Sequence, residues 1–182
     1  MATTPVKDKN MLRICQIMNE DIGHLYASAI QYKQHASLLE GVFTQLEADL
    51  KEHADDDLQQ AAWLTEKVSF YNEIPSITVA PIISATPSLV SLELLISDLI
   101  TITNAVNRFR RHLAEITQMG VEFGSVRKFY EEMLDHEEEH LNSFKNFLSP
   151  YMKESDPAGD LDSSFTDTQI VDVVKLANII RG

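Results

Sequence analysis

The stretch Leu134-Asp135-His136-Glu137-Glu138-Glu139-His140-Leu141-Asn142-Ser143-Phe144 decides how the rest of this sequence is interpreted. Apolar residues surround it at helical intervals of three and four: Phe129, Tyr130, Met133, Leu134, Leu141, Phe144, Phe147 and Leu148. At that spacing Glu137 and His140 fall on the apolar face of the helix, where a core is expected. Because burying an unpaired carboxylate is costly, the sequence predicts that a metal ion, another side chain or water accompanies these two residues.

Composition limits the class of protein. The chain has 182 residues, 44% of them hydrophobic, which suits one domain with or without an appendage. Its net charge of −13 argues against nucleic-acid binding through a basic surface and favours an acidic protein that attracts cations. A single cysteine, Cys15, excludes an internal disulfide framework and indicates a reducing, cytoplasmic location. The most apolar run, 74–102, contains prolines and acidic residues, so we do not expect a membrane span.

Amphipathic periodicity predicts four long helices, over 11–40, from about 45 to the residue before Pro75, from about 87 to Gly120, and over 125–149. Gly41 is placed to cap the first helix. Thr44-Gln45-Leu46-Glu47 has the pattern of a capping box for the second. Thr86-Pro87 suits the start of the third.

The connections predict the topology. The first and third are short, so the helices that they join are antiparallel, whereas the connection over 73–86 is long enough for the second and third helices to run parallel. We therefore expect an all-α fold: a ferritin-like antiparallel four-helix bundle with a long crossover between helices two and three and a short C-terminal fifth helix.

The chain divides into an N-terminal tail (1–10), the bundle (11–152), an acidic linker (153–165) and a C-terminal helix (166–182). The last segment has one apolar face, formed by Ile170, Val173, Val174, Ala177 and Ile180. A helix this short is unstable alone in water. We therefore expect it to dock on its own bundle, on a neighbouring subunit of a homo-oligomer or on another protein.

Over about 11–150 the sequence resembles the ferritin-like superfamily, in particular the bacterioferritin-like and mini-ferritin-like proteins. The resemblance is carried by Met18-Asn19-Glu20-Asp21-Ile22, Gln31-Tyr32-Lys33-Gln34-His35-Ala36, Glu52-His53-Ala54-Asp55-Asp56-Asp57-Leu58, Ser97-Asp98-Leu99 and Glu137-Glu138-Glu139-His140. The last of these motifs is the most specific.

The resemblance implies a di-iron centre in the bundle core, with one Glu from each of helices one and three and a Glu-x-x-His from each of helices two and four. Three of the six positions keep ligand chemistry: Glu137, His140 and Asp57. The other three fall on Leu25, Gln60 and Ile102. Two divalent irons bring four positive charges and the remaining carboxylates offset two, so we expect a degenerate ferroxidase site with no catalytic residue. Leu58 stands where the haem-binding relatives place a methionine, so no haem is expected.

Two further interpretations of the motif remain open. In the first, Glu137 and His140 belong to a buried polar cluster with Asp57, Gln60 or the Tyr26 hydroxyl, without a metal. In the second, a single ion is held by the i, i+4 pair His136 and His140, with Glu137 or Asp57 as a third ligand. His53 has the same spacing from Asp57, but we expect it to point outward. In each of the acidic runs 55–57 and 137–139, one member is expected to face inward.

Three functions are compatible with these residues. The first is a subunit of an oligomer or a larger complex, with a degenerate site and at most weak metal binding. The second is iron storage or sequestration of the bacterioferritin type, with iron or another divalent metal at an incomplete or relocated site. The third is a di-iron oxidase with substitute ligands, drawn from Asp21, His24, Asp98 and Asn104.

Overall fold

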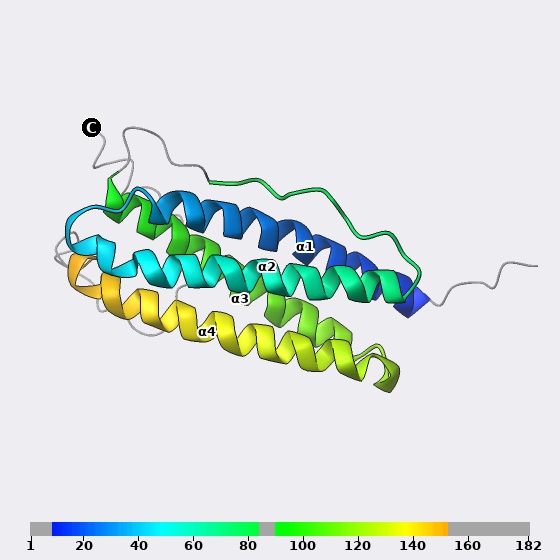
Figure 1. Ribbon diagram of the computed structural model, residues 1–182. Helices are drawn as coiled ribbons and strands as arrows, with labels where there is room; N and C mark the ends of the chain where they lie inside the picture. The colour runs from blue at the N-terminus through cyan, green and yellow to red at the C-terminus, as the bar shows by residue number, and fades with distance from the viewer. Residues whose placement is uncertain (1–8, 84–89, 153–182) are drawn as a thin grey trace, which may run out of the picture.

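The computed structural model describes residues 9–83 and 90–152, and within these ranges all regular structure is helical. Four long helices follow one another along the chain: α1 (Lys9–Ala36), α2 (Glu47–Phe70), α3 (Ser91–Thr117) and α4 (Gly124–Met152). Short 3₁₀ segments, η1 (Gly41–Leu46) and η2 (Val121–Phe123), precede α2 and α4. The predicted all-α four-helix bundle is confirmed (Figure 1).

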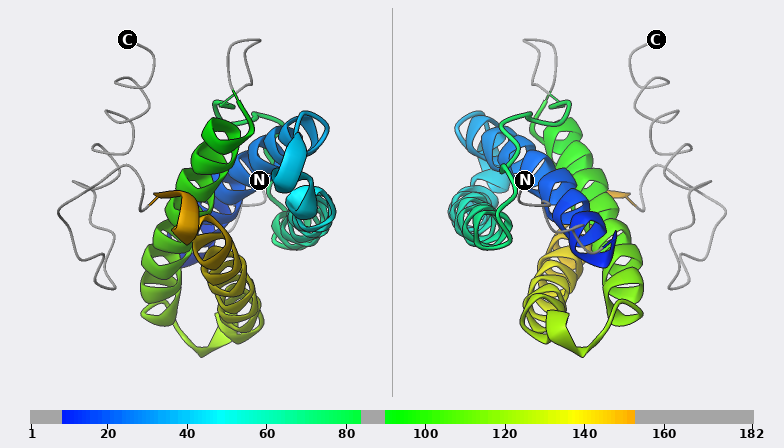
Figure 2. Two further views of the ribbon diagram at one scale, coloured as in Figure 1. Left: turned by 90° about the vertical axis from the view of Figure 1, so that its left-hand side faces the viewer. Right: turned by 90° about the vertical axis from the view of Figure 1, so that its right-hand side faces the viewer.

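The bundle consists of two helical hairpins, α1 with α2 and α3 with α4 (Figure 1). The hairpins meet mainly where α1 packs on α3, and in the end-on views of Figure 2 α2 lies beside α1 and α4 beside α3, with α2 and α4 set apart from each other. Side chains, rather than close backbone packing, therefore join α2 to α4.

The apolar core has two parts along the bundle axis. One contains Ile17, Leu64, Phe109 and Tyr130, and the other contains Tyr32, Leu50, Ile102 and Phe144, each with further buried neighbours. On α2 the boundary between the two parts falls between Ala54 and Ala61, and on α4 between Met133 and Leu141. The acidic motifs at 57 and 137 lie at that boundary.

The connection between α2 and α3 runs along the outside of α1 (Figure 1). The Ala80 N–H donates to the Gly23 carbonyl (3.0 Å), and the Ser76 N–H donates to Asn19 Oδ1 (2.7 Å). A Cβ atom at Gly23 would lie 2.5 Å from the Thr78 carbonyl oxygen, which is closer than real contacts allow. The crossover can approach α1 this closely because residue 23 is glycine.

Helix ends differ from the sequence prediction. The first helix ends at Ala36 instead of residue 40, and 41–46 forms a 3₁₀ segment instead of a capping box. The Thr44 hydroxyl donates back to the Gly41 carbonyl (2.9 Å), so it does not cap α2. Pro150 lies inside α4, which continues to Met152 instead of ending at 149.

The predicted tail (1–8 of it), the Thr86-Pro87 cap, the acidic linker and the C-terminal helix lie outside the described residues. Among the helices that are described, none is long and apolar enough to cross a membrane.

Candidate functional site

Three ionisable side chains meet in the core between α2 and α4. His53 and Asp57 come from α2 and Glu137 comes from α4, and each is at most 1% exposed. One ligand atom from each residue lies within 4.8 Å of the others. His53 Nε2 is 3.1 Å from Glu137 Oε1, and the Ser28 hydroxyl of α1 hydrogen-bonds to Asp57 Oδ2. We call these three residues the inner group.

Several polar atoms of the inner group have no hydrogen-bond partner. They are Asp57 Oδ1, Glu137 Oε2 and His53 Nδ1, and the neighbouring Gln60 Oε1 is in the same position. A buried polar atom without a partner costs about 1–3 kcal/mol. The three oxygens among these atoms are acceptors, and a cation within reach of them would supply the missing partner.

The inner group can also balance its own charge. Burial, together with the nearby Glu137 carboxylate, raises the pKa of Asp57 to about 8. Burial alone would lower the pKa of His53, but Glu137 outweighs it and brings that pKa to about 9. Burial opposes ionisation of Glu137, yet His53 holds its pKa below the ordinary 4.5. These shifts favour a cationic His53 paired with an anionic Glu137, and they favour the protonated form of Asp57.

A second group lies on the exposed side of the inner one. His140 stacks on His53, with ring centroids 3.8 Å apart and an angle of 4° between the ring planes. Burial and the neighbouring His53 lower the pKa of His140 to about 4. His136 lies 4.7 Å from His140 between ring centroids, and His136 Nε2 is 3.7 Å from Asp56 Oδ2. We call Asp56, His136 and His140, all half-buried, the outer group.

The structure confirms some of the expectations for the residues that the sequence singled out and contradicts others. Asp57 and Glu137 come together in the core, and each acidic run has one buried member, as expected. The hydrogen bonds to these carboxylates come from His53 and Ser28, which the sequence did not predict. The expectation that His53 points outward is wrong, since its side chain is fully buried.

A signal for His53 is present in the sequence. His53 is three residues after Leu50 and four before Asp57, so it shares the helix face of both. The partner of His136 was also missed, because Asp56 looked like part of a solvated face.

The donor set does not fit a di-iron centre. Leu25 and Ile102, to which the resemblance assigns the Glu positions of α1 and α3, are 1% and 0% exposed and belong to the apolar core. Gln60, at the second His position, presents an amide with an unpartnered oxygen. The carboxylates of the inner group come from α2 and α4 only, and they offset two of the four charges that two divalent irons would bring.

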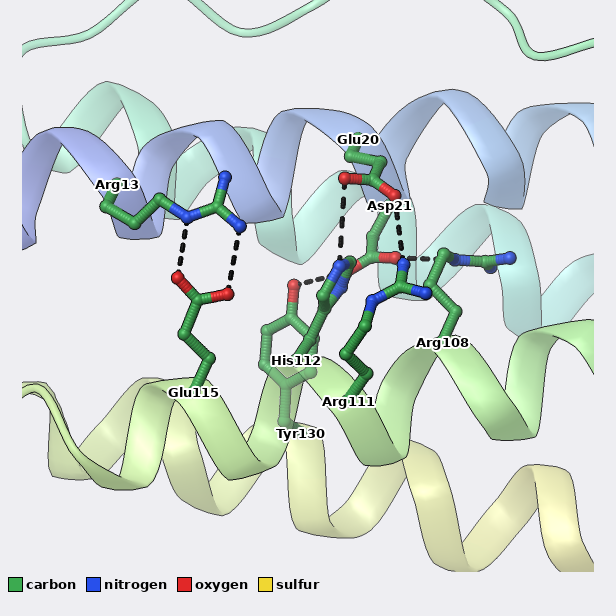
Figure 3. Close-up of polar contacts among 8 residues, drawn as sticks. All are labelled: Arg13, Glu20, Asp21, Arg108, Arg111, His112, Glu115 and Tyr130. Carbon is green, nitrogen blue, oxygen red and sulfur yellow. Dashed lines mark hydrogen bonds and ion pairs between the residues drawn. The ribbon is translucent and has the colours of Figure 1, made fainter.

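Asp21, one of the substitute ligands considered above, already has three partners. Its carboxylate accepts hydrogen bonds from Arg108 Nε (2.7 Å), the Tyr130 hydroxyl (2.6 Å) and His112 Nδ1 (2.8 Å), as Figure 3 shows. Burial raises the pKa of Asp21, but these contacts outweigh it and hold the pKa below 3.8. Asp21 therefore ties α1 to α3 and α4.

Asp98 lies in a third polar cluster. His35 Nδ1 is 2.7 Å from Asp98 Oδ1, and Gln31 Nε2 donates to the same oxygen (2.8 Å). The Gln31 side-chain carbonyl also accepts from the Ile83 N–H (3.2 Å), so this cluster joins α1, α3 and the crossover. Of these two substitute ligands, Asp21 has partners at both carboxylate oxygens, whereas Asp98 has them at Oδ1 and its buried Oδ2 has none.

Comparisons with known proteins agree with the fold. The family model described as Ferritin, ferritin-like domain, matches residues 15–152. A solved structure titled as ferritin-like, diiron-carboxylate proteins from Bacillus anthracis str. Ames is similar to this chain, with a TM-score of 0.69 at 17% sequence identity, and the match covers 78% of this chain and 99% of that one. No curated protein sequence matches the chain. Because the family model covers most of the sequence, this protein belongs to the ferritin-like family.

Proposed function

We propose that this protein is a ferritin-like bundle that lacks a di-iron oxidase centre and binds at most one divalent metal ion in its core, through His53, Asp57 and Glu137. The observation that carries the proposal is the pairing of Leu25 and Ile102. Both are fully buried in α1 and α3, and the resemblance assigns to them the carboxylate positions that these two helices supply in the family's centre. Around the inner group, the oxygens without a protein partner are those of Asp57 and Gln60 on α2 and Glu137 on α4.

Charge limits the number of ions. One divalent ion with the carboxylates of Asp57 and Glu137 and a neutral His53 is electrically balanced. A second ion would leave two positive charges uncompensated in the buried core, which is strongly unfavourable. The metal-free group is balanced by protons instead. The core can therefore hold one ion or none. This capacity fits a structural or metal-sequestering subunit better than an oxidase.

Iron loading tests this proposal. His136→Ala is the suitable background, because it removes a residue of the outer group and leaves the inner group intact. In this background we expect at most one iron per chain by elemental analysis and slow aerobic oxidation of Fe²⁺ by absorbance. Adding Glu137→Gln to His136→Ala should remove any ion bound in the core. Two irons per chain, with fast oxidation that Glu137→Gln abolishes, would overturn the proposal.

We also infer that the chain works as a homo-oligomer, as a shell or complex subunit. Support comes from apolar side chains that stand exposed from the end of α2 into the crossover: Phe70 is 72% exposed, Ile74 86% and Ile77 95%. Singly exposed apolar residues are ordinary, but a run of this kind marks contact surfaces. Light scattering tests the assembly, and a monomeric mass at micromolar concentration would contradict it.

A further inference from the structure

We propose that Asp56, His136 and His140 form a separate site for one divalent transition-metal ion such as Zn²⁺, on the exposed side of the contact between α2 and α4. Its three ligands are different residues from those of the inner group, and it stands even if the core binds no metal. Asp56 and His136 lie outside the positions of the family's di-iron motif.

The side chains are close to a coordinating arrangement. Their ligand atoms lie within 4.8 Å of one another, and His136 Nε2 is already 3.7 Å from Asp56 Oδ2. Tetrahedral zinc with ligands at about 2.0–2.2 Å places those atoms roughly 3.3 Å apart. Small side-chain rotations therefore suffice, and no helix has to move.

The helices hold the ligands in place. His136 and His140 are four residues apart on α4, so both rings project from one face, and the Asp56 carboxylate comes from α2 opposite. His140 is further oriented by its stacking on the buried ring of His53. Two helices and one ring stack thus preorganise the site, which reduces the entropy that binding an ion would otherwise cost.

The surroundings favour a cation. An open cavity of about 380 Å³ lies beside His136, and its lining includes the carboxylates of Glu132, Asp135 and Glu139. These side chains concentrate cations at the site, in a protein whose net charge is −13. Two imidazoles and one carboxylate suit a borderline ion such as zinc better than Mg²⁺ or Ca²⁺. Three protein ligands leave a fourth position open to water from the cavity.

Titration of the full-length protein with ZnCl₂ tests the site, with calorimetry for affinity and ¹⁵N-edited NMR of the histidine side chains for its location. We expect His136→Ala and Asp56→Asn each to weaken Zn²⁺ binding by at least tenfold, because even an outer-shell partner is worth about 10–100-fold in metal affinity. In the unmodified chain the ring signals of His136 and His140 should shift on adding Zn²⁺.

Two matched variants separate the possible outcomes. His24→Ala removes a half-buried histidine of α1 that belongs to neither group, and it should leave Zn²⁺ binding unchanged. Glu137→Gln disables the inner group and should leave the outer site intact. Zn²⁺ binding that is lost in Glu137→Gln but kept in His136→Ala would assign the ion to the core and overturn this site. Absence of any Zn²⁺ binding in the unmodified chain would also overturn this site. That result would leave the proposal that the core lacks a di-iron centre unaffected.

Discussion

In the proposed function, Leu25 and Ile102 are the two residues that limit the metal capacity of the core. Each is apolar and fully buried, and the resemblance assigns to each a position where a di-iron centre takes a carboxylate. We predict that Leu25→Glu with Ile102→Glu and Gln60→His raises the iron content of the core by up to one ion per chain, because the added carboxylates supply the missing charge. Elemental analysis after anaerobic Fe²⁺ loading measures the gain.

The matched control keeps the size of the new side chains and removes their charge. The control is the triple variant Leu25→Gln, Ile102→Gln and Gln60→His. It should be no more stable than the Glu variant, and it should gain no iron. If the Glu variant also gains none while remaining folded by circular dichroism, the assignment of these three positions to the family's ligand pattern is incorrect.

Asp21 is the strongest polar tie between the hairpins. Asp21→Asn leaves Arg108 in the core without its counter-ion, and removing one partner of a buried pair costs about 3–5 kcal/mol. Because the pKa of Asp21 is lower in the folded state, its contribution is fully present above its ordinary pKa of 3.8 and is lost as pH falls through the folded value. Urea denaturation should therefore show a large loss for Asp21→Asn at pH 7 that shrinks below about pH 4.

The exposed Arg13–Glu115 pair, next to Asp21 in Figure 3, provides the comparison. Both side chains are more than a third exposed, so Glu115→Gln should cost less than about 1 kcal/mol. A loss in Asp21→Asn no larger than this, or one that is constant from pH 7 to pH 3, would mean that the Asp21 carboxylate is not held as described.

At the scale of elements, the path of the crossover depends on Gly23. We predict that Gly23→Ala destabilises the fold by about 1–3 kcal/mol, because its Cβ would overlap the Thr78 carbonyl, which is backbone and cannot rotate away. Hydrogen exchange at the Ala80 amide, which bonds to Gly23, should accelerate with it. Gly124→Ala, where the added Cβ meets nothing within 4 Å, should cost nothing or stabilise by up to about 1 kcal/mol. Equal effects of the two substitutions would contradict this account.

The elements also show what the sequence could predict. Helical periodicity identified all four helices and their order, because burying one apolar face fixes a repeat over many residues. It failed at the ends, where a single local contact decides: Thr44 bonds back to Gly41, so α2 starts two residues later than predicted. Pro150 did not end α4, although its missing N–H and its ring disfavour a helix interior.

The candidate site was predictable only in part, for a related reason. Asp57 and Glu137 interrupt an apolar stripe, so each sequence segment reveals them by itself. The pairing of His53 with Glu137 and of Asp56 with His136 depends on how α2 lies against α4, and no single helix pattern contains that information. The spacing along α2 was enough to predict that His53 faces the core, but not that its partner is Glu137.

At the scale of the whole molecule, ionisable residues occupy the places where the hairpins meet. The α1–α3 contact carries the Asp21 and Asp98 clusters, and the inner and outer groups bridge α2 and α4. Buried polar groups need matching partners, so they fix which helices pair and in what register. The same bridges place ligand atoms of two helices within reach of one ion, which makes α2 and α4 the part of the fold suited to binding.

The net charge of −13 predicts a salt dependence of stability. Like charges repel in the compact state, and the Debye length falls from about 30 Å at 0.01 M salt to about 8 Å at 0.15 M. Screening of this repulsion should raise the free energy of unfolding, measured by urea denaturation, by roughly 1 kcal/mol between these NaCl concentrations. Salt also weakens the exposed ion pairs, but these are worth only about 0–1 kcal/mol each. Replacing the exposed Glu52 and Glu66 by Lys removes two units of negative charge per substitution and should reduce that rise. Stability that falls with NaCl would show that attractive pairs outweigh the excess negative charge.

A free energy of unfolding that rises with micromolar Zn²⁺ at constant ionic strength would come from bound metal, because screening is unchanged there.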